Sequence, residues 1–454
     1  MGAYDAIVIG AGQAGPSVAA ALAGDGQRVL LVEMDRVGGT CLNHGCRPTK
    51  ALRASAAVAH QARRAAEYGV HTGQVVVDFP SAIQRVQTLI DGMRQGLHDW
   101  LTSIDGLDLD TRTATLVGDP EGRAHRVTVG EDTHTTARVY LDLGGRAARP
   151  AIEGLDTAEF LTEVELLNLT ALPRHLVIVG GGYIGLEFGQ MFRRFGAEVT
   201  ILAGRGIAAR EDPDVVEALT QILTGEGVTI RNTRPRRVRQ SADGDITVET
   251  VDGEPVVGSH LLVATGRISN LDLLGPEHGL ETDERGFVRI GPRYETSLPG
   301  IWALGDVNGH GAFTHTAYQD SQILLNPPRT VTGRVTTYAM FTDPPLGRVG
   351  MGLAEARASG RNVLVAEVPM SSVSRAKLEG ETAGLMRVLV DGDTEEILGA
   401  TILGLQADDV VQIVGLAIQA KISYPTLRDV LPIHPTVAEF LPSILGSLTP
   451  LQAG

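Results

Sequence analysis

Two cysteines, Cys41 and Cys46, are the residues whose type and spacing point most directly to chemistry, and the chain has no others. A disulfide that closes so short a loop would constrain the unfolded chain little, so it is a poor structural staple. A zinc site would need four ligands, commonly with two cysteines spaced as CxxC. A redox pair fits the pattern better than a staple, a zinc site or two inert thiols, and we predict no metal site.

The spacing of the two cysteines predicts a local distortion. Residues five apart on a regular helix are separated by roughly 7.5 Å along its axis, whereas a disulfide prefers about 4.4–6.8 Å between Cα atoms. A bridge between Cys41 and Cys46 therefore requires a distorted helix, which Gly45 makes easy. A strained bridge is more readily reduced, and a helix dipole stabilises a thiolate in the first turn. We predict a redox-active disulfide.

An apolar segment, residues 4–9, runs into a GxGxxG loop formed by Gly10, Gly12 and Gly15. Such a loop lets a pyrophosphate approach the backbone and rest on the N-terminus of the next helix. The following apolar segment ends at Glu33, where an acid can bind a ribose hydroxyl. The pattern predicts a dinucleotide-binding unit, and the alternative is a glycine-rich turn without a ligand.

The pattern recurs in a second GxGxxG loop, at Gly180, Gly182 and Gly185. The position that corresponds to Glu33 is Ala203 here, so the acid that would hold a free 2′-hydroxyl is missing. Arg205 and Arg210 follow closely. Loss of the acid together with nearby arginines favours a 2′-phosphate, and hence NADPH over NADH. The alternative is that both arginines lie on a solvated loop.

Further signals belong to dinucleotide-binding units. An apolar strand is predicted to end in a tight turn at Gly266 and to close the second unit. Another apolar strand is followed by Asp306, where an acid can bind the sugar chain of a cofactor. We expect Thr314 to cap a helix that begins near His315, with its N-terminus facing electron-rich atoms of a flavin.

With these features the chain resembles the pyridine nucleotide–disulfide oxidoreductases, the class I flavoprotein disulfide reductases, over essentially its whole length. The family includes glutathione reductase, dihydrolipoamide dehydrogenase and mercuric reductase. The chain looks most similar to mercuric-reductase-like members, through segments 39–41, 209–212 and 434–436. The resemblance implies an α/β fold with two Rossmann-like dinucleotide-binding domains and a C-terminal α+β dimerisation domain.

The resemblance also implies roles for single residues. Cys46 would face the flavin as the charge-transfer thiolate, and Cys41 would be the interchange thiol that attacks the substrate. Lys50 would lie near flavin N5 and pair with Glu187.

The family's acid–base would be His434, which reaches in from the partner subunit of a homodimer and is oriented by Glu439. The first glycine loop would bind FAD and the second NADPH. The residues predicted to bind the two cofactors are Gly10, Gly12, Gly15, Glu33, Gly39, Thr40, Lys50, Asp306, His315, Gly180, Gly182, Tyr183, Ile184, Arg205, Arg210 and Gly266.

The chain departs from the family pattern in two places. The family has an Ala-Thr-Gly turn in each dinucleotide-binding domain, and the first of these turns reads Asp142-Leu143-Gly144 here. We expect this change to weaken the family motif without affecting the chemistry. Mercuric reductases carry a vicinal cysteine pair near the C-terminus, and this chain has no cysteine after Cys46. A soft metal ion could therefore not be passed from one thiolate pair to another.

These inferences predict a homodimeric FAD enzyme that uses NADPH to reduce a low-molecular-weight disulfide through Cys41 and Cys46, with His434 managing protons. Two alternatives stay open. One is reduction of a metal ion, such as Hg(II) or Cu(II), or of a quinone. The other is a dihydrolipoamide dehydrogenase-like component of a larger complex, against which Ala203 speaks.

Composition limits the class of protein. The 454 residues carry a net charge of −15, which argues against nucleic acid and anionic membranes as partners. No apolar run reaches membrane-spanning length, and the N-terminal residues lack the basic region of a signal peptide. A redox pair without further cysteines fits a reducing cytoplasm.

The length allows three domains. We predict an FAD-binding domain at residues 1–148, an NADPH-binding domain at 149–267, a returning FAD segment at 268–330 and an interface domain at 331–454. Because the interface domain would carry His434 to the neighbour's disulfide, a monomer would lack a complete site.

Overall fold

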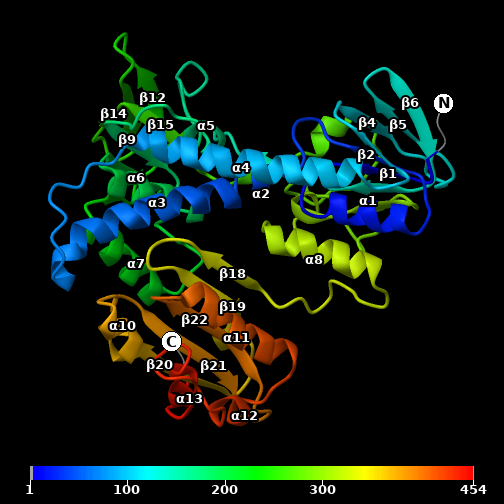
Figure 1. The fold of residues 1–454 in the computed structure, drawn as a ribbon. Coiled ribbons are helices and arrows are strands. Elements are labelled where there is room, and N and C mark those ends of the chain that lie inside the picture. Colours follow the sequence, from blue (N-terminus) through cyan, green and yellow to red (C-terminus); the bar gives the residue numbers. More distant parts are fainter. Residues whose placement is uncertain (1–3, 453–454) are drawn as a thin grey trace.

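The computed structural model describes residues 4–452. Its N-terminal part is built on a parallel five-stranded sheet with the strand order β17-β7-β1-β2-β3 (Figure 1). All residues of β1 and β2 are buried, as expected for parallel strands covered on both faces. The strands are β1 (Ala6–Ile9), β2 (Val29–Val32), β3 (Leu107–Asp110), β7 (Val139–Leu141) and β17 (Ile301–Ala303).

Different layers cover the two faces of this sheet. One face packs against α1 (Gly15–Gly24) and α8 (Thr314–Leu325). The other packs against the antiparallel strands β4 (Ala114–Val117), β5 (His125–Val129) and β6 (Asp132–Thr136). Because β17 and α8 come from residues after 300, a distant segment returns to complete the first unit.

A second unit repeats this architecture with the strand order β11-β10-β9-β15, again all parallel. Apolar side chains join one face of its sheet to a small antiparallel sheet and the other face to helices. Its strands are β9 (His175–Val179), β10 (Glu198–Leu202), β11 (Thr229–Arg231) and β15 (His260–Val263), with β12 (Pro235–Gln240), β13 (Ile246–Thr250) and β14 (Val256–Gly258) in the small sheet. Its helices are α5 (Glu163–Leu166), α6 (Tyr183–Phe195) and α7 (Pro213–Gly225).

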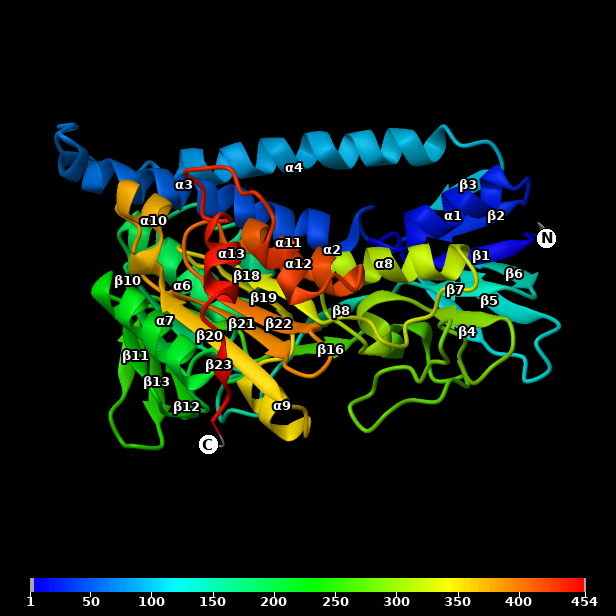
Figure 2. The ribbon, with the colours of Figure 1, turned by 90° about the horizontal axis from the view of Figure 1, so that it is seen from below.

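Elements between the two units tie them together. The helices α3 (Cys46–Arg64) and α4 (Phe79–Thr102) lie side by side along the second unit, and α4 continues to the first unit (Figure 2). Apolar residues of both helices join the core of the second unit around α6. The remaining connecting elements are α2 (Gly39–Asn43), the antiparallel strands β8 (Gly145–Ala147) and β16 (Arg267–Ser269), and the 3₁₀ turns η1 (Ala65–Tyr68), η2 (Leu271–Leu274) and η3 (Gly305–Asn308).

The C-terminal part is a separate antiparallel sheet with the strand order β18-β19-β22-β21-β20-β23. Its core strands β21 (Leu385–Asp391) and β22 (Ile397–Leu403) are buried throughout. The helix α11 (Ala407–Gln419) packs on it. The other elements are β18 (Thr337–Met340), β19 (Leu346–Gly350), α9 (Leu353–Ala358), β20 (Val363–Pro369), η4 (Met370–Ser372), α10 (Ser374–Leu378), α12 (Tyr424–Arg428), α13 (Phe440–Leu445) and β23 (Thr449–Pro450).

The predicted fold class is confirmed, because two Rossmann-like units are followed by an α+β unit. The exact boundaries at residues 148, 267 and 330 stay a prediction. Within residues 4–452, no helix combines the length and the apolar character needed to cross a bilayer.

Candidate active site

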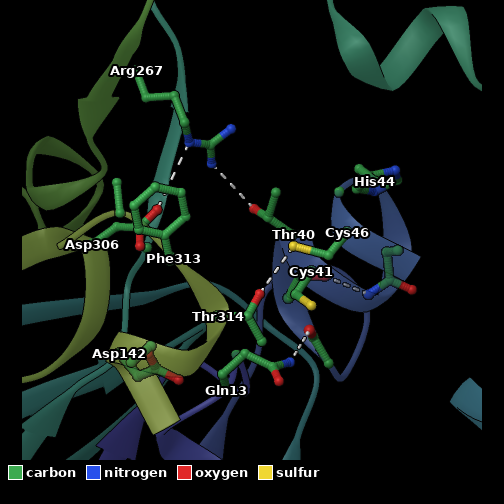
Figure 3. Close-up of a pocket in the computed structure, with 18 of the residues that line it drawn as sticks. Gln13, Thr40, Cys41, His44, Cys46, Asp142, Arg267, Asp306, Phe313 and Thr314 are labelled. Carbon is green, nitrogen blue, oxygen red and sulfur yellow. Dashed lines mark hydrogen bonds and ion pairs between the residues drawn. The ribbon is translucent and has the colours of Figure 1, made fainter. Parts of the chain in front are cut away.

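A cavity of about 850 Å³ lies where the two Rossmann-like units and the C-terminal part meet. Figure 3 shows a close-up of it, with both cysteines on one wall and Asp306 and Phe313 on another. The lining includes these residues from the sequence prediction: Gly10, Gly12, Glu33, Gly39, Thr40, Cys41, Cys46, Lys50, Tyr183, Ile184, Glu187, Asp306 and His315.

The helix that carries the cysteines is broken between them. The helix α2 ends at Asn43, and α3 begins at Cys46. A Cβ atom on Gly45 would stand 2.9 Å from the carbonyl oxygen of Thr40, which is closer than a side chain tolerates. The predicted distortion at Gly45 is therefore confirmed, and the broken backbone leaves no room for a side chain at this position.

The break gives the two thiols different surroundings. Cys41 is buried, whereas Cys46 is exposed to the cavity as the first residue of α3. A hydrogen bond from Cys41, aided by Thr314 and the charge of Lys50, lowers the pKa of Cys46 to about 6. The same hydrogen bond and burial raise the pKa of Cys41. At neutral pH the pair therefore holds a thiolate at Cys46 and a thiol at Cys41.

Thr314 does not cap α8 as expected, because α8 begins at Thr314 itself and the capping position is Phe313. The chain is extended at Phe313, so the Thr314 hydroxyl is free to reach Cys46, and its Oγ1 lies 3.1 Å from the Cys46 Sγ. The N-terminus of α8 faces the cavity as predicted. His315 lines the cavity, and its Nε2 lies 2.7 Å from the carbonyl oxygen of Thr337.

Lys50 and Glu187 form an ion pair beside Cys46. The Lys50 Nζ lies 2.8 Å from Oε2 of Glu187, which is only 4% exposed on α6. The other carboxylate oxygen of Glu187 accepts a hydrogen bond from the Phe341 amide at 2.9 Å, and the Lys50 ammonium stands over the Phe341 ring. These contacts hold the ammonium group in place, and its positive charge stabilises the Cys46 thiolate.

The first glycine loop is shaped by a close backbone approach. A Cβ atom on Gly10, which has a φ of +104°, would stand 2.2 Å from the Asp142 carbonyl oxygen. A Cβ atom on Gly15 would stand 2.0 Å from the carbonyl oxygen of Gly10. Glu33 is buried at the end of β2 and accepts a hydrogen bond from the Ala11 amide at 2.9 Å. Burial raises the pKa of Glu33.

Asp142 is a cavity residue that was not among the site residues predicted from the sequence. The expectation that the change at residues 142–144 leaves the chemistry untouched stays a prediction. Its Oδ2 accepts hydrogen bonds from the amides of Ala14 at 3.1 Å and Gly15 at 2.7 Å. From the sequence, this segment was interpreted only as a weakened turn, whereas an acid in a segment that faces a glycine loop at a helix N-terminus is itself a signal.

The second glycine loop has the same construction. A Cβ atom on Gly180 would stand 2.2 Å from the carbonyl oxygen of Ala264, and one on Gly185 would stand 2.2 Å from that of Gly180. Gly182 precedes α6, whose first residues Tyr183 and Ile184 line the cavity. At Gly266, where a tight turn was predicted, φ is +132°, and the chain bends between β15 and β16.

The region expected to select the nicotinamide cofactor is rich in arginine. Ala203 is buried at the end of β10, while Arg205 and Arg210 are both exposed. A third arginine was missed: the Arg234 side chain lies against Gly204. Within residues 4–452, none of these three guanidinium groups forms a salt bridge.

His434 and Glu439 are paired far from the cysteines of their own chain. The Nδ1 of His434 lies 2.8 Å from Oε2 of Glu439, and the imidazole is 76% exposed. His434 lies between α12 and α13, well away from α2 in Figure 1, and does not line the cavity. Leu431 and Ile433 beside it are 93% and 79% exposed. This apolar, exposed segment is suited to contact another subunit.

Two protein-family models match nearly all of the chain. Residues 4–321 match the pyridine nucleotide-disulphide oxidoreductase family, and residues 336–443 match its dimerisation domain. The chain belongs to this family. As a flavoprotein disulfide reductase it is an enzyme that depends on FAD, uses a nicotinamide dinucleotide and forms a homodimer.

Curated relatives of this disulfide reductase span several activities. The probable pyridine nucleotide-disulfide oxidoreductase RclA of Escherichia coli is 34% identical, with 97% of this chain and 98% of RclA covered. A mercuric reductase of Streptomyces lividans is 33% identical, with 96% of this chain and 94% of the relative covered. A dihydrolipoyl dehydrogenase of Chlamydia pneumoniae is 29% identical over 96% of this chain and 95% of the relative.

Solved structures agree with the fold of this reductase. The Cu(II) complex of the HOCl-induced flavoprotein disulfide reductase RclA from E. coli superimposes with a TM-score of 0.88 and is 32% identical, with 98% of this chain and 100% of that chain covered. LpdA from Mycobacterium tuberculosis superimposes with a TM-score of 0.87 over 97% of this chain and 99% of that chain, and at 24% identity it supports the fold alone.

The cavity of this reductase fits FAD. A glycine loop at a helix N-terminus, the buried acid Glu33 and the half-buried acid Asp306 line one continuous space with the cysteines. When bound, FAD supplies the two-electron relay between the nicotinamide and the cysteine pair.

Proposed function

We propose that this protein is an NADPH-dependent reductase of a low-molecular-weight disulfide, acting through Cys41 and Cys46 in a reducing cytoplasm. The observation that carries the proposal is the break between α2 and α3, which places Cys46 at a helix N-terminus and leaves Cys41 beside it. A thiolate and a thiol held next to one another are what thiol–disulfide exchange requires.

We propose the following order of bond changes. Cys41 loses its proton to the partner subunit's His434, and the Cys41 thiolate attacks one sulfur of the substrate disulfide. The substrate S–S bond breaks, a mixed disulfide forms on Cys41, and the leaving thiolate takes the proton back from the imidazolium. The Cys46 thiolate then attacks the Cys41 sulfur, which releases the second substrate thiolate and restores the Cys41–Cys46 bond.

The different pKa values of the two cysteines suit these roles. Cys46 is ionised near neutral pH and is ready for the second attack, because its pKa is lowered to about 6. Cys41 has a raised pKa and needs a base before it can attack. We infer that Glu439 holds the imidazole of His434 in one tautomer for this purpose, because the two are hydrogen-bonded at 2.8 Å.

We infer a preference for NADPH from the arginines near the second glycine loop. Ala203 leaves no carboxylate to bind a 2′-hydroxyl or to repel a 2′-phosphate. Arg205, Arg210 and Arg234 carry guanidinium groups without a carboxylate partner within residues 4–452. Guanidinium groups bind phosphate by charge-assisted hydrogen bonds.

A second candidate function is the reduction of a metal ion. It is favoured by the relatives, since one is a mercuric reductase and E. coli RclA has been solved as a Cu(II) complex. Within residues 4–452, however, no cluster of three or more His, Cys, Asp or Glu side chains could hold a metal ion. Within one chain, Cys41 and Cys46 would have to bind it without a third ligand of this kind.

An NADPH-consumption screen of the purified holoenzyme separates these candidates. The panel contains low-molecular-weight disulfides, Cu(II), Hg(II) and quinones, and Cys41→Ser is the control. We expect turnover with at least one disulfide and none in Cys41→Ser. Turnover with metal ions or quinones but with no disulfide would reject the first candidate, and turnover with metal ions would favour the second.

A further inference from the structure

Asp142 places a carboxylate in the first glycine loop, and no assigned role accounts for it. It follows Leu141, the last residue of β7, and is 6% exposed. A Cβ atom on Gly12 would stand 2.8 Å from its Oδ2, so the carboxylate touches the loop directly. Figure 3 shows the side chain among the residues that line the cavity.

This carboxylate occupies donors that an anionic ligand would otherwise use. The amides of Ala14 and Gly15, at the start of α1, both donate to its Oδ2. Amides at a helix N-terminus are the groups that attract a pyrophosphate. An ionised Asp142 therefore brings a negative charge to the part of the cavity predicted to receive the negative charges of FAD. Like charges in a desolvated site repel each other strongly.

The surrounding groups add to this negative charge. Glu33, at the end of β2, and Asp306, on η3, lie in the same cavity and act electrostatically on Asp142. Asp320 on α8 acts on Asp306, but it is itself paired with Arg334. The guanidinium of Arg267 lies 3.8 Å from Asp306. Within residues 4–452, no cation forms a salt bridge with Asp142.

The balance of these effects favours the protonated acid. Burial, aided by the charges of Asp306 and Glu33, raises the pKa of Asp142 to about 8, although the amides of Gly15 and Ala14 oppose this. The group therefore changes charge in a pH range that can be reached with a folded protein. A bound dinucleotide would raise the pKa further, because its own charge is negative.

We propose that Asp142 links FAD retention to a proton: the chain holds FAD tightly when Asp142 is protonated and more weakly when it is ionised. The inference rests on FAD binding in this cavity, which the visible absorbance of the purified protein tests separately. It does not depend on which acceptor the enzyme reduces.

The direction of the pH dependence follows from linkage. Below a pH of about 8, Asp142 is already protonated in the FAD-free chain, so the dissociation constant for FAD is constant. Above that pH, binding must take up one proton, and the dissociation constant rises by up to about tenfold for each pH unit.

The first test measures FAD release from diluted holoenzyme by the fluorescence of free FAD, between about pH 7 and about pH 9.5. The native dissociation constant should rise at least about tenfold over this range. In Asp142→Asn it should change less than about twofold, because the amide keeps an oxygen acceptor for Ala14 and Gly15 but does not ionise.

The matched control is Glu33→Gln, which removes another buried acid of the same cavity. It should weaken FAD binding at every pH and keep the alkaline rise. An alkaline rise that disappears in Glu33→Gln but persists in Asp142→Asn would overturn the proposal, because the linked proton would then belong to Glu33.

A second test can reject the proposal with the native chain alone. FAD is titrated into the full chain stripped of FAD, by calorimetry at about pH 9 in two buffers with different heats of ionisation. The native chain should take up close to one proton for each FAD bound, and Asp142→Asn close to none. If the native chain binds FAD without proton uptake, the proposal is wrong, whether or not the variant folds.

Discussion

The sulfur of Cys46 lies 3.1 Å from the hydroxyl oxygen of Thr314, and each of the two residues begins a helix. The positive ends of α3 and α8 therefore converge on one sulfur atom, and both favour its ionised form. The two residues are 268 positions apart in the chain. The thiolate site exists because the segment that contains β17 and α8 comes back to the first unit.

Removal of the Thr314 hydroxyl should raise the pKa of Cys46. In Thr314→Val, the thiolate loses a hydrogen bond to a charged group worth about 1.5–3 kcal/mol, so its pKa should rise from about 6 by about one unit or more. The measurement is the rate at which the reduced enzyme is alkylated at different pH values. The loss of thiolate absorbance reports the progress of alkylation. Thr314→Ser, which keeps the hydroxyl, should behave like the native enzyme. An unchanged titration in Thr314→Val would show that Thr314 has no part in the thiolate's stability.

Replacement of Cys46 and replacement of Cys41 should have opposite effects on the charge-transfer absorbance. Cys46→Ser should lack the long-wavelength charge-transfer absorbance of the reduced holoenzyme, because the ionised sulfur is gone. Cys41→Ser should retain this absorbance even before reduction, because Cys46 can no longer be bridged. Both variants should lose disulfide turnover. The reverse assignment of the absorbance would exchange the roles of the two residues.

The nicotinamide preference should depend on the arginines. We expect a kcat/KM for NADPH at least about tenfold above that for NADH, because one charge-assisted hydrogen bond contributes about 1.5–3 kcal/mol. Arg205→Ala, Arg210→Ala and Arg234→Ala should each lower the value for NADPH selectively.

Arg236→Ala is the control for this series, because Arg236 lies on β12 and is paired with Glu249. It should leave the ratio of the two kcat/KM values unchanged. Equal efficiency of the native enzyme with NADPH and NADH would show that the arginines lie on a solvated loop.

His434 should act in the site of the partner subunit. His434→Ala should slow disulfide turnover at least about a hundredfold, as expected for loss of a positioned base, and leave flavin reduction by NADPH nearly intact. Stopped-flow absorbance separates the two steps.

Subunit mixing tests where this base acts. Heterodimers of His434→Ala and Cys41→Ser subunits should contain one complete site and recover activity. Heterodimers that form but stay inactive would place the base and the thiol in the same chain.

Local patterns were sufficient to predict much of this site. The glycine loops and the break at Gly45 follow from residue types that allow only a few conformations, whereas the Lys50–Glu187 pair was expected only from the family resemblance. The contacts that were missed join distant segments: Asp142 lies 127 positions from Gly15, and the Arg234 side chain lies against Gly204. Such contacts depend on how the units pack against one another, and the periodicity and spacing of residues in the sequence do not reveal this packing.

The most direct test of the central claim is the ratio of thiol released to NADPH oxidised. With the best disulfide found in the screen, the native enzyme should release two product thiols for each NADPH oxidised, and Cys41→Ser should release none. NADPH oxidation without thiol release, or undiminished thiol release by Cys41→Ser, would contradict disulfide reduction through Cys41 and Cys46.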